Sequence, residues 1–297
     1  MMDLLRQFGQ VILYGPPGTG KTREAKRIAL SMLSGDAPPT VATSGEIEEL
    51  LKPFHQAKRY EIVVFHPAYE YEQFVGGIEP MVTAGGQLAF QVKAGVFLRL
   101  CRLAEQSRQS AVLLIDEINR GSLPKLLGEL VHALEYRAPH SVTLPFICEG
   151  RSDLVVPTNL YIIATMNSSD QSIGHIDAAI RRRFALVHIG PNPDVVRRSW
   201  QQIAGWPNAE SYGGQLARLM TDLNQALGGD DPTAEVELGV GHSYFLPNPG
   251  SARDAALLQV RMKWVSQVQP LLRQYAQVLN LGVDFFQQFR DLPTPPA

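Results

Sequence analysis

Cysteine is scarce in this sequence, and long hydrophobic runs and basic tracts are missing. Only Cys101 and Cys148 occur, and neither belongs to a Cys-x-x-Cys pair or a ligand-spaced cluster, which argues against a zinc site and a disulfide framework. No apolar stretch approaches the ~20 residues of a membrane helix, and the first residues lack the charged and apolar regions of a signal peptide. We therefore expect a cytoplasmic protein that does not enter the membrane.

Positive and negative side chains are nearly equal in number. The 27 Lys and Arg residues and 29 Asp and Glu residues leave a net charge of −2, so no global field draws the chain to nucleic acid or anionic lipid. The one dense basic cluster, residues 181–183, is too short for a nucleic-acid-binding tail. A chain of 297 residues with 45% hydrophobic residues is long enough for one large domain and a smaller one.

The most informative stretch is a glycine-rich loop that ends in Lys-Thr. An apolar run over 11–14 predicts a strand before it, and apolar residues at helical spacing over 25–33 predict a helix after it. Strand, glycine loop and helix are the context of a phosphate-binding loop, in which backbone N–H groups and the helix dipole face an anion. The loop consists of Gly15, Pro16, Pro17, Gly18, Thr19, Gly20, Lys21 and Thr22. Lys21 would reach the β- and γ-phosphates, and the Thr22 hydroxyl would bind Mg²⁺.

A second motif indicates hydrolysis. Residues 111–115 are all apolar and lead into Asp116 and Glu117, as expected for a buried central strand whose carboxyl end carries acids. We expect Asp116 to hold the Mg²⁺ shell, and Glu117 to orient or deprotonate the attacking water.

Strands and helices alternate up to about residue 190, which predicts an α/β fold with a parallel sheet wrapped by helices. Further strands are expected at 61–66 and 160–166 and a hairpin at 142–144 and 154–156, with one helix running from a cap at Ser122 through Leu134. Beyond Pro191 the strand signals fade into helices, and Pro270 is expected to break the pattern before a last helix. We therefore divide the chain into a nucleotide-binding domain, 1–190, and a smaller helical domain, 191–297.

Several stretches together indicate a family. Asn167 follows the 160–166 strand, where its amide could bind the attacking water, and residues 178–184 are expected to form an arginine-bearing helix. The order of phosphate loop, acidic strand, Asn strand and arginine helix resembles AAA+ P-loop nucleoside triphosphatases. More narrowly, the chain resembles the nucleotidase subunit of McrB-type restriction systems in residues 65–74, 114–120, 166–172 and 241–245.

The resemblance implies a homo-oligomer that forms a ring, expected to be a hexamer, with residues 191–297 as the lid of each subunit. In such a ring Arg182 or Arg183 would reach the neighbour's γ-phosphate, and Asp170 would hold the water or a neighbour's arginine. It also implies Mg²⁺ as cofactor, GTP or ATP as substrate with GTP favoured, and an McrC-type endonuclease as partner. The loop begins at Gly15, which leaves no room for a DNA-reading domain before it. We therefore expect DNA to be reached indirectly, through a partner or a missing N-terminal domain.

The chain also departs from the pattern of this branch at position 171, and two alternative functions remain open. Gln171 stands where this branch usually has arginine, which puts that arginine's roles in question. The alternatives are an ATP-driven protein-remodelling enzyme of the MoxR or dynein-related type, and a non-hydrolysing nucleotide switch that serves as a scaffold. His132 and Glu135 have metal-ligand spacing but no third ligand, so we interpret them as a solvated helix face, and we expect His66 to be buried.

Overall fold

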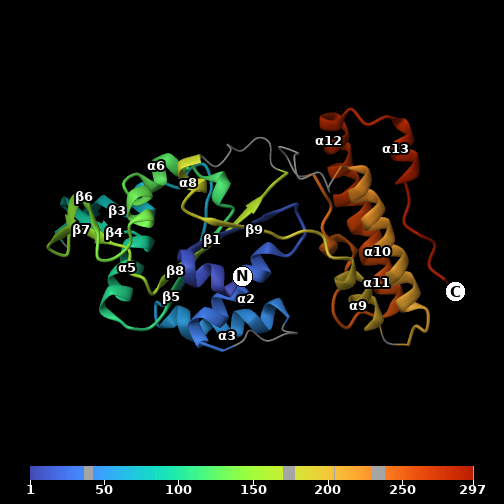
Figure 1. The fold of residues 1–297 in the computed structure, drawn as a ribbon, viewed down its shortest axis with the longest axis horizontal. Coiled ribbons are helices and arrows are strands. Elements are labelled where there is room, and N and C mark those ends of the chain that lie inside the picture. The colour runs from blue at the N-terminus through green and yellow to red at the C-terminus, as the bar shows by residue number, and fades with distance from the viewer. Residues whose placement is uncertain (37–42, 84, 170–177, 204, 229–237, 297) are drawn as a thin grey trace. The chain divides into compact units, whose positions relative to one another are not determined.

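The computed structural model describes residues 1–296 except 37–42, 84, 170–177, 204 and 229–237 (Figure 1). The chain forms two compact units. The first, here the α/β unit, takes its residues from Met1–Tyr14, Thr22–Met166 and Ser172–Val187. The second, here the helical unit, takes them from Gly15–Lys21, Asn167–Gln171 and His188–Ala297. The phosphate loop therefore groups with the C-terminal helices, and the division into domains 1–190 and 191–297 stays a prediction.

A five-stranded sheet forms the centre of the fold, in the order β2-β5-β8-β1-β9. β2 pairs with β5 and β5 with β8 in parallel, which brings Val64 level with Asp116 and Ile115 level with Ala164. β5 is buried except at its carboxyl end because residues 111–115 are all apolar. The strands are β1 (Gln10–Gly15), β2 (Tyr60–Val64), β5 (Ala111–Asp116), β8 (Leu160–Asn167) and β9 (Ala185–His188).

Helices and short turns accompany the sheet in the α/β unit. Apolar side chains of α5, including Phe97, Leu100 and Cys101, join the core with those of β5. The predicted continuous helix from Ser122 to Leu134 is wrong: it is broken at Gly128, whose φ of 43° is a left-handed value that side chains disfavour. The elements are α1 (Met2–Phe8), α2 (Lys21–Ser34), α3 (Ser44–Gln56), α4 (Tyr71–Phe74), α5 (Val96–Gln106), η1 (Ile118–Arg120), α6 (Leu123–Leu127), α7 (Leu130–Glu135) and α8 (Ala178–Arg181).

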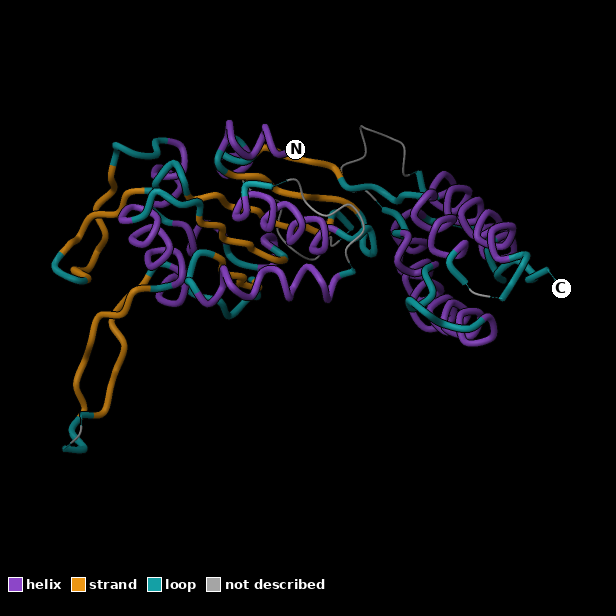
Figure 2. The backbone as a smooth tube through the Cα atoms, turned by 90° about the horizontal axis from the view of Figure 1, so that it is seen from below, coloured by secondary structure: helices purple, strands orange, loops and turns teal. Residues whose placement is uncertain are grey.

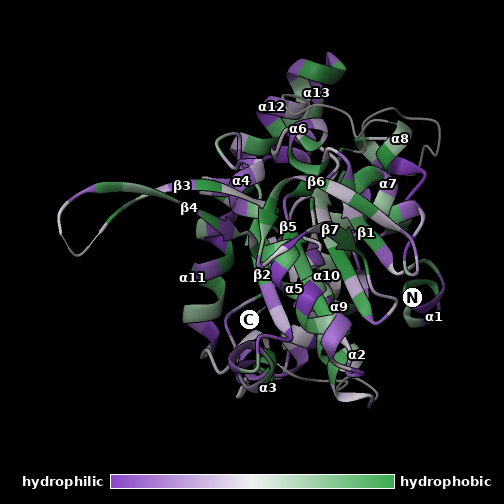
Figure 3. Cartoon of the chain, turned by 90° about the vertical axis from the view of Figure 1, so that its left-hand side faces the viewer, coloured by the Kyte–Doolittle hydropathy of each residue, from purple (hydrophilic) through white to green (hydrophobic). Residues whose placement is uncertain are grey.

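Two antiparallel hairpins lie outside the main sheet. β6 (Ser141–Cys148) and β7 (Arg151–Val155) form the hairpin that the sequence predicts. β3 (Gly76–Val82) and β4 (Leu88–Ala94) form a second hairpin that our sequence analysis missed. It extends away from the rest of the α/β unit as a narrow ribbon (Figures 2 and 3).

One face of the β3–β4 ribbon is apolar. The register pairs Ile78 with Val92, Pro80 with Phe90, and Val82 with Leu88, and the alternation of a strand places all six on the same side. Val82, Leu88 and Phe90 keep 70%, 67% and 69% of their surface exposed. The ribbon therefore offers a row of hydrophobic side chains that the described part of the chain leaves uncovered.

The helical unit has its own core around Trp200 and Tyr212, whose rings meet edge to face at 5.0 Å. The expectation that Pro270 breaks the helical pattern is wrong. A short π-helix, η3, leads directly into α12, and the proline lies in the first turn of α12. Along the described chain no helix combines the length and apolarity needed to cross a bilayer. The elements are α9 (Pro193–Gln201), α10 (Ala209–Ala226), η2 (His242–Phe245), α11 (Arg253–Lys263), η3 (Trp264–Val268), α12 (Gln269–Leu279) and α13 (Val283–Gln288).

Candidate nucleotide-binding and hydrolysis site

The phosphate loop connects β1 to α2, as the sequence predicts. Lys21 is only 7% exposed, and its Nζ donates to the carbonyl oxygens of Gly15 at 3.0 Å and Pro16 at 2.8 Å. The Thr19 hydroxyl donates to the same Pro16 carbonyl at 3.0 Å. The Lys21 and Thr19 side chains are therefore bonded to the backbone of their own loop. The loop directly precedes the N-terminus of a 14-residue helix, where the helix dipole favours an anion.

Backbone conformation explains the glycines of this loop. Gly18 and Gly20 have φ values of 79° and 78°, in the left-handed region that favours glycine. A side chain at Gly15 would meet the Ile189 carbonyl oxygen at 2.3 Å. The glycine positions of the motif are thus required by the fold of the loop as well as by its chemistry.

In the α/β unit, Asp116 at the end of β5 meets Thr22 in α2. The Thr22 hydroxyl donates to Asp116 Oδ1 at 2.9 Å. A hydroxyl and a carboxylate are hard oxygen donors, the type that Mg²⁺ prefers, so this pair fits the ion that the sequence analysis assigns to it.

Thr165 is a site residue that our sequence analysis missed. It is 2% exposed in β8, and its hydroxyl also donates to Asp116 Oδ1. The same hydroxyl accepts the backbone N–H of Glu117 at 3.2 Å. Thr165 therefore fixes both acids of the motif, and the available signal was a hydroxyl near the end of an otherwise apolar strand.

Glu117 directly follows β5 in a left-handed conformation, with φ of 57° and ψ of 48°. Few residues other than glycine adopt this region, and such strain is concentrated at functional sites. The Glu117 carboxylate lies 3.4 Å from the Arg120 guanidinium, and a quarter of the side chain, 25%, is exposed. The side chain is thus partly accessible at the end of the strand, although its Oε2 atom is buried, and this exposure suits a residue that must meet water.

Asn167, which was expected to follow a strand ending at Met166, is itself the last residue of β8 and is half-buried. The next residue, Ser168, donates its backbone N–H to the carbonyl of Gly15 at 3.1 Å. This bond joins the Asn-bearing strand end to the first residue of the phosphate loop within the helical unit. Asp170, the other residue expected here, lies outside the described residues, as does Gln171.

The expected helix over 178–184 is shorter in the structure: α8 ends at Arg181, so both predicted arginines follow it in a turn. The two arginines have different surroundings. Arg183 donates from Nε to the Val131 carbonyl at 2.9 Å, and its other nitrogens bond the Ala179 carbonyl and the Glu135 carboxylate. Arg182 is exposed, and its side chain forms no hydrogen bond or ion pair with the residues that the structure describes. The structure thus ties Arg183 into its own chain and leaves the Arg182 side chain exposed to solvent.

Two further expectations concern the pair His132 and Glu135, and His66. Glu135 pairs with Arg183, and among the described residues no three His, Cys, Asp or Glu side chains gather as a metal site would require. The expectation that His66 is buried is wrong, because it is exposed and rests against the Tyr69 ring at 5.6 Å.

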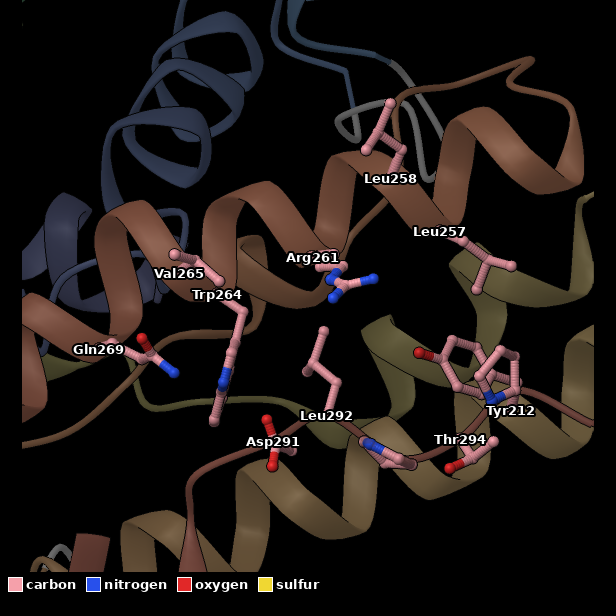
Figure 4. A pocket seen from close by; sticks show the side chains of 12 residues that line it. Tyr212, Leu257, Leu258, Arg261, Trp264, Val265, Gln269, Asp291, Leu292 and Thr294 are labelled. Carbon is pink, nitrogen blue, oxygen red and sulfur yellow. The ribbon is translucent and has the colours of Figure 1, made fainter.

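A separate pocket of about 500 Å³ lies in the helical unit (Figure 4). Trp264 and Arg261 line it from one helical segment, and Leu292 and Asp291 from the C-terminal segment. Its lining includes none of the residues of the phosphate loop or the acidic strand. This hollow is therefore distinct from the site predicted from the sequence.

Comparisons with known proteins agree with the motifs. A family described as AAA domain (dynein-related subfamily) matches residues 10–184. The chain is 32% identical over 272 residues to the type IV methyl-directed restriction enzyme EcoKMcrB subunit of Escherichia coli (strain K12), which covers 89% of this chain and 53% of that protein. It is 26% identical over 212 residues to the type II restriction enzyme BsuMI component YdiS of Bacillus subtilis (strain 168), covering 60% of this chain and 56% of that protein.

The chain therefore spans about half the length of these curated relatives. The family match covers more than half of the 297 residues and includes the glycine loop, the acidic strand and the Asn strand. The chain belongs to the dynein-related subfamily of AAA domains, and it resembles the nucleotidase subunit of McrB-type restriction systems.

Proposed function

We propose that this protein is a Mg²⁺-dependent nucleoside triphosphatase that cleaves the γ-phosphate of GTP, or alternatively of ATP. The observation that carries the proposal is the hydrogen bond between Thr22 and Asp116, which joins the two metal-binding residues of separate motifs. The preference for GTP rests on the resemblance to McrB-type subunits.

Each side chain of the proposed site has a distinct chemical role. Lys21 binds the β- and γ-phosphates, and Thr22 and Asp116 hold Mg²⁺, which neutralises charge that develops on the phosphate oxygens. Glu117 accepts a proton from the attacking water, or orients it, and Asn167 hydrogen-bonds the same water. Thr165 keeps the Asp116 carboxylate and the Glu117 backbone in place. We also propose that Asp170 holds the attacking water or an arginine of the neighbouring subunit.

We propose that subunits assemble head to tail into a hexameric ring, in which an arginine of one subunit completes the site of the next. The exposed Arg182 suits this role better than Arg183, because Arg183 is already engaged by Val131, Ala179 and Glu135. An arginine supplied in trans can raise phosphoryl-transfer rates by about 10³–10⁵-fold.

We propose that the ring is the motor of an McrBC-like restriction system in the cytoplasm. Both curated relatives are named as parts of restriction enzymes, which supports this context. The partner would be an McrC-type endonuclease, and DNA would be reached through that partner or through a further domain. The exposed apolar face of the β3–β4 ribbon is a surface suited to such a partner.

A second candidate is an ATP-driven protein-remodelling enzyme, which the dynein-related description of the matching family favours. The discriminating experiment measures phosphate release with GTP and with ATP, each with and without an McrC-type endonuclease subunit from the same organism. We expect GTP turnover that the endonuclease stimulates, and DNA cleavage only when both proteins are present. Turnover of ATP alone, with no response to an endonuclease, would favour the remodelling enzyme. Absence of any turnover would contradict both.

A further inference from the structure

A segment of the helical unit, residues 239–246, lies against the phosphate loop; it includes the 3₁₀ turn η2, and we name it the strap. The Gly241 N–H donates to the Pro17 carbonyl at 2.9 Å, and the Ser243 N–H donates to the Gly18 carbonyl at 2.9 Å. Two successive carbonyls of the loop are therefore held by two backbone donors of the strap.

The contact is so close that backbone touches backbone. A Cβ added to Gly241 would lie 2.0 Å from the Gly18 carbonyl carbon and 2.4 Å from the Thr19 nitrogen. A Cβ added to Gly18 would lie 2.6 Å from the Tyr244 ring. The close contact between the strap and the loop therefore depends on glycine at both positions, because any side chain there would collide with the other segment.

Side chains from four helices of the same unit hold the strap. From α10, Asn224 donates to the Val240 carbonyl at 3.0 Å and accepts the Val240 N–H at 2.7 Å. From α11, Lys263 donates to the carbonyls of Ser243 at 3.1 Å and Leu246 at 2.8 Å. Two further donors are Trp200 Nε1, to Phe245, and the Tyr275 hydroxyl, to Gly239.

These bonds also set the direction of the N–H groups in the loop. A peptide is planar, and in its trans form the C=O of one residue points opposite to the N–H of the next. Because the carbonyls of Pro17 and Gly18 point at the strap, the N–H groups of Gly18 and Thr19 point away from it. In a phosphate loop those N–H groups are the ones that cradle the phosphates.

We propose that Asn224 and Lys263 are positioning residues for phosphate binding, acting through the strap on the N–H groups of the loop. This inference rests on the proposed nucleotide binding, and it adds residues 207 and 246 positions away from the loop's Pro17 as determinants of affinity. Neither residue touches the nucleotide in this account.

The test compares two variants. Lys263→Met removes the hydrogen bonds to the Ser243 and Leu246 carbonyls, and Lys263→Arg retains a cation able to donate to both. Arg261→Met is the matched control, because Arg261 lies on the same helix and is exposed. Nucleotide Kd, KM and kcat are measured with GTP and ATP, and folding is followed by thermal unfolding. We expect Lys263→Met to raise Kd and KM about tenfold and to leave kcat within about twofold, since loop N–H groups stabilise ground and transition states alike. Lys263→Arg should restore most of the affinity, and Arg261→Met should behave as the wild type.

Asn224→Ala is the second variant and should raise Kd and KM in the same way, so the proposal is still decided if Lys263→Met does not fold. An unchanged Kd in a folded Lys263→Met or Asn224→Ala protein would overturn the proposal. A lower kcat at unchanged KM would also overturn it, because that pattern indicates only a loss of folded protein. Failure of the wild type to bind either nucleotide would instead refute the proposed function, so the two failures are distinguishable.

Discussion

Thr22 and Asp116 are 94 positions apart in the chain, yet the threonine hydroxyl and the aspartate carboxylate meet at 2.9 Å. One belongs to the first turn of α2 and the other to the end of β5. The parallel arrangement of the sheet brings such strand ends and helix starts to one edge. The pairing joins a phosphate motif to an acidic motif, and this joint arrangement gives the site its expected chemistry.

Replacement of the hydroxyl tests this pair. Thr22→Val keeps the shape of the side chain and removes the oxygen donor, so we expect the Mg²⁺ concentration for half-maximal turnover to rise about tenfold or more. Thr22→Ser should preserve the wild-type dependence. The measurement is phosphate release across an Mg²⁺ titration, and an unchanged midpoint in Thr22→Val would remove Thr22 from the metal site.

Glu117→Gln separates binding from hydrolysis. The amide keeps the size of the carboxylate but cannot take a proton from water, so kcat should fall by about 10²–10⁴-fold. Nucleotide Kd should stay within a few fold, because Lys21, Thr22 and Asp116 are untouched. Single-turnover hydrolysis and equilibrium binding of the same preparation check both expectations. Turnover at the wild-type rate would show that Glu117 is not the base.

Arg182 and Arg183 should respond differently to alanine substitution. Arg183→Ala removes bonds to Val131, Ala179 and Glu135, so it should lower the free energy of unfolding by about 1–3 kcal/mol. Arg182→Ala should leave stability within about 0.5 kcal/mol, since its side chain is exposed, and should lower kcat at least tenfold. Denaturant unfolding and turnover measurements on both variants provide the comparison.

Mixing extends this test to assembly. A ring of Arg182→Ala and Lys21→Ala subunits contains some interfaces in which an intact phosphate loop faces an intact arginine, so mixing should restore part of the lost activity. If the mixture is no more active than its components, Arg182 does not act across an interface.

The sequence was sufficient for the parts whose chemistry demands particular residues. β1, α2, β5 and β8 were predicted because buried strands require continuous apolar runs, and the loop requires glycines. Thr165 was missed because a hydroxyl in a strand reveals its partner only once β8 lies beside β5. The choice between Arg182 and Arg183 similarly depends on where α7 places Glu135 and the Val131 carbonyl.

The β3–β4 ribbon was missed for a different reason. Residues 90–93 alternate between apolar and polar as a half-buried strand would, but Pro80 argues against the partner strand. In a hairpin of two strands both strands are edges, so a proline is tolerated. The break at Gly128 and the π-helix before Pro270 are likewise local backbone choices that apolar periodicity does not encode.

The thiols give a test of burial. Cys101 is 2% exposed and Cys148 is 6% exposed, and burial raises the pKa of each thiol above its usual value. Because the thiolate is the reactive form, both should be protonated and slow to react at pH 8. A colorimetric disulfide reagent should therefore modify the native protein slowly and two thiols rapidly after denaturation. Fast modification of the native protein would contradict the burial of these side chains.

The β3–β4 ribbon provides the test of the partner. Leu88 and Phe90 are more than half exposed on its apolar face, and covering each by a partner would contribute about 1–3 kcal/mol. The double variant Leu88→Ser/Phe90→Ser should leave stability and nucleotide turnover of the isolated chain unchanged, and should lower stimulation by the endonuclease about tenfold or more. Gln91→Ser, on the opposite face of the same strand, is the matched control. If the double variant is stimulated as strongly as the wild type, the partner binds elsewhere. If its turnover without the endonuclease falls while its stability is unchanged, the ribbon serves the activity of the isolated protein and is not a surface reserved for the partner.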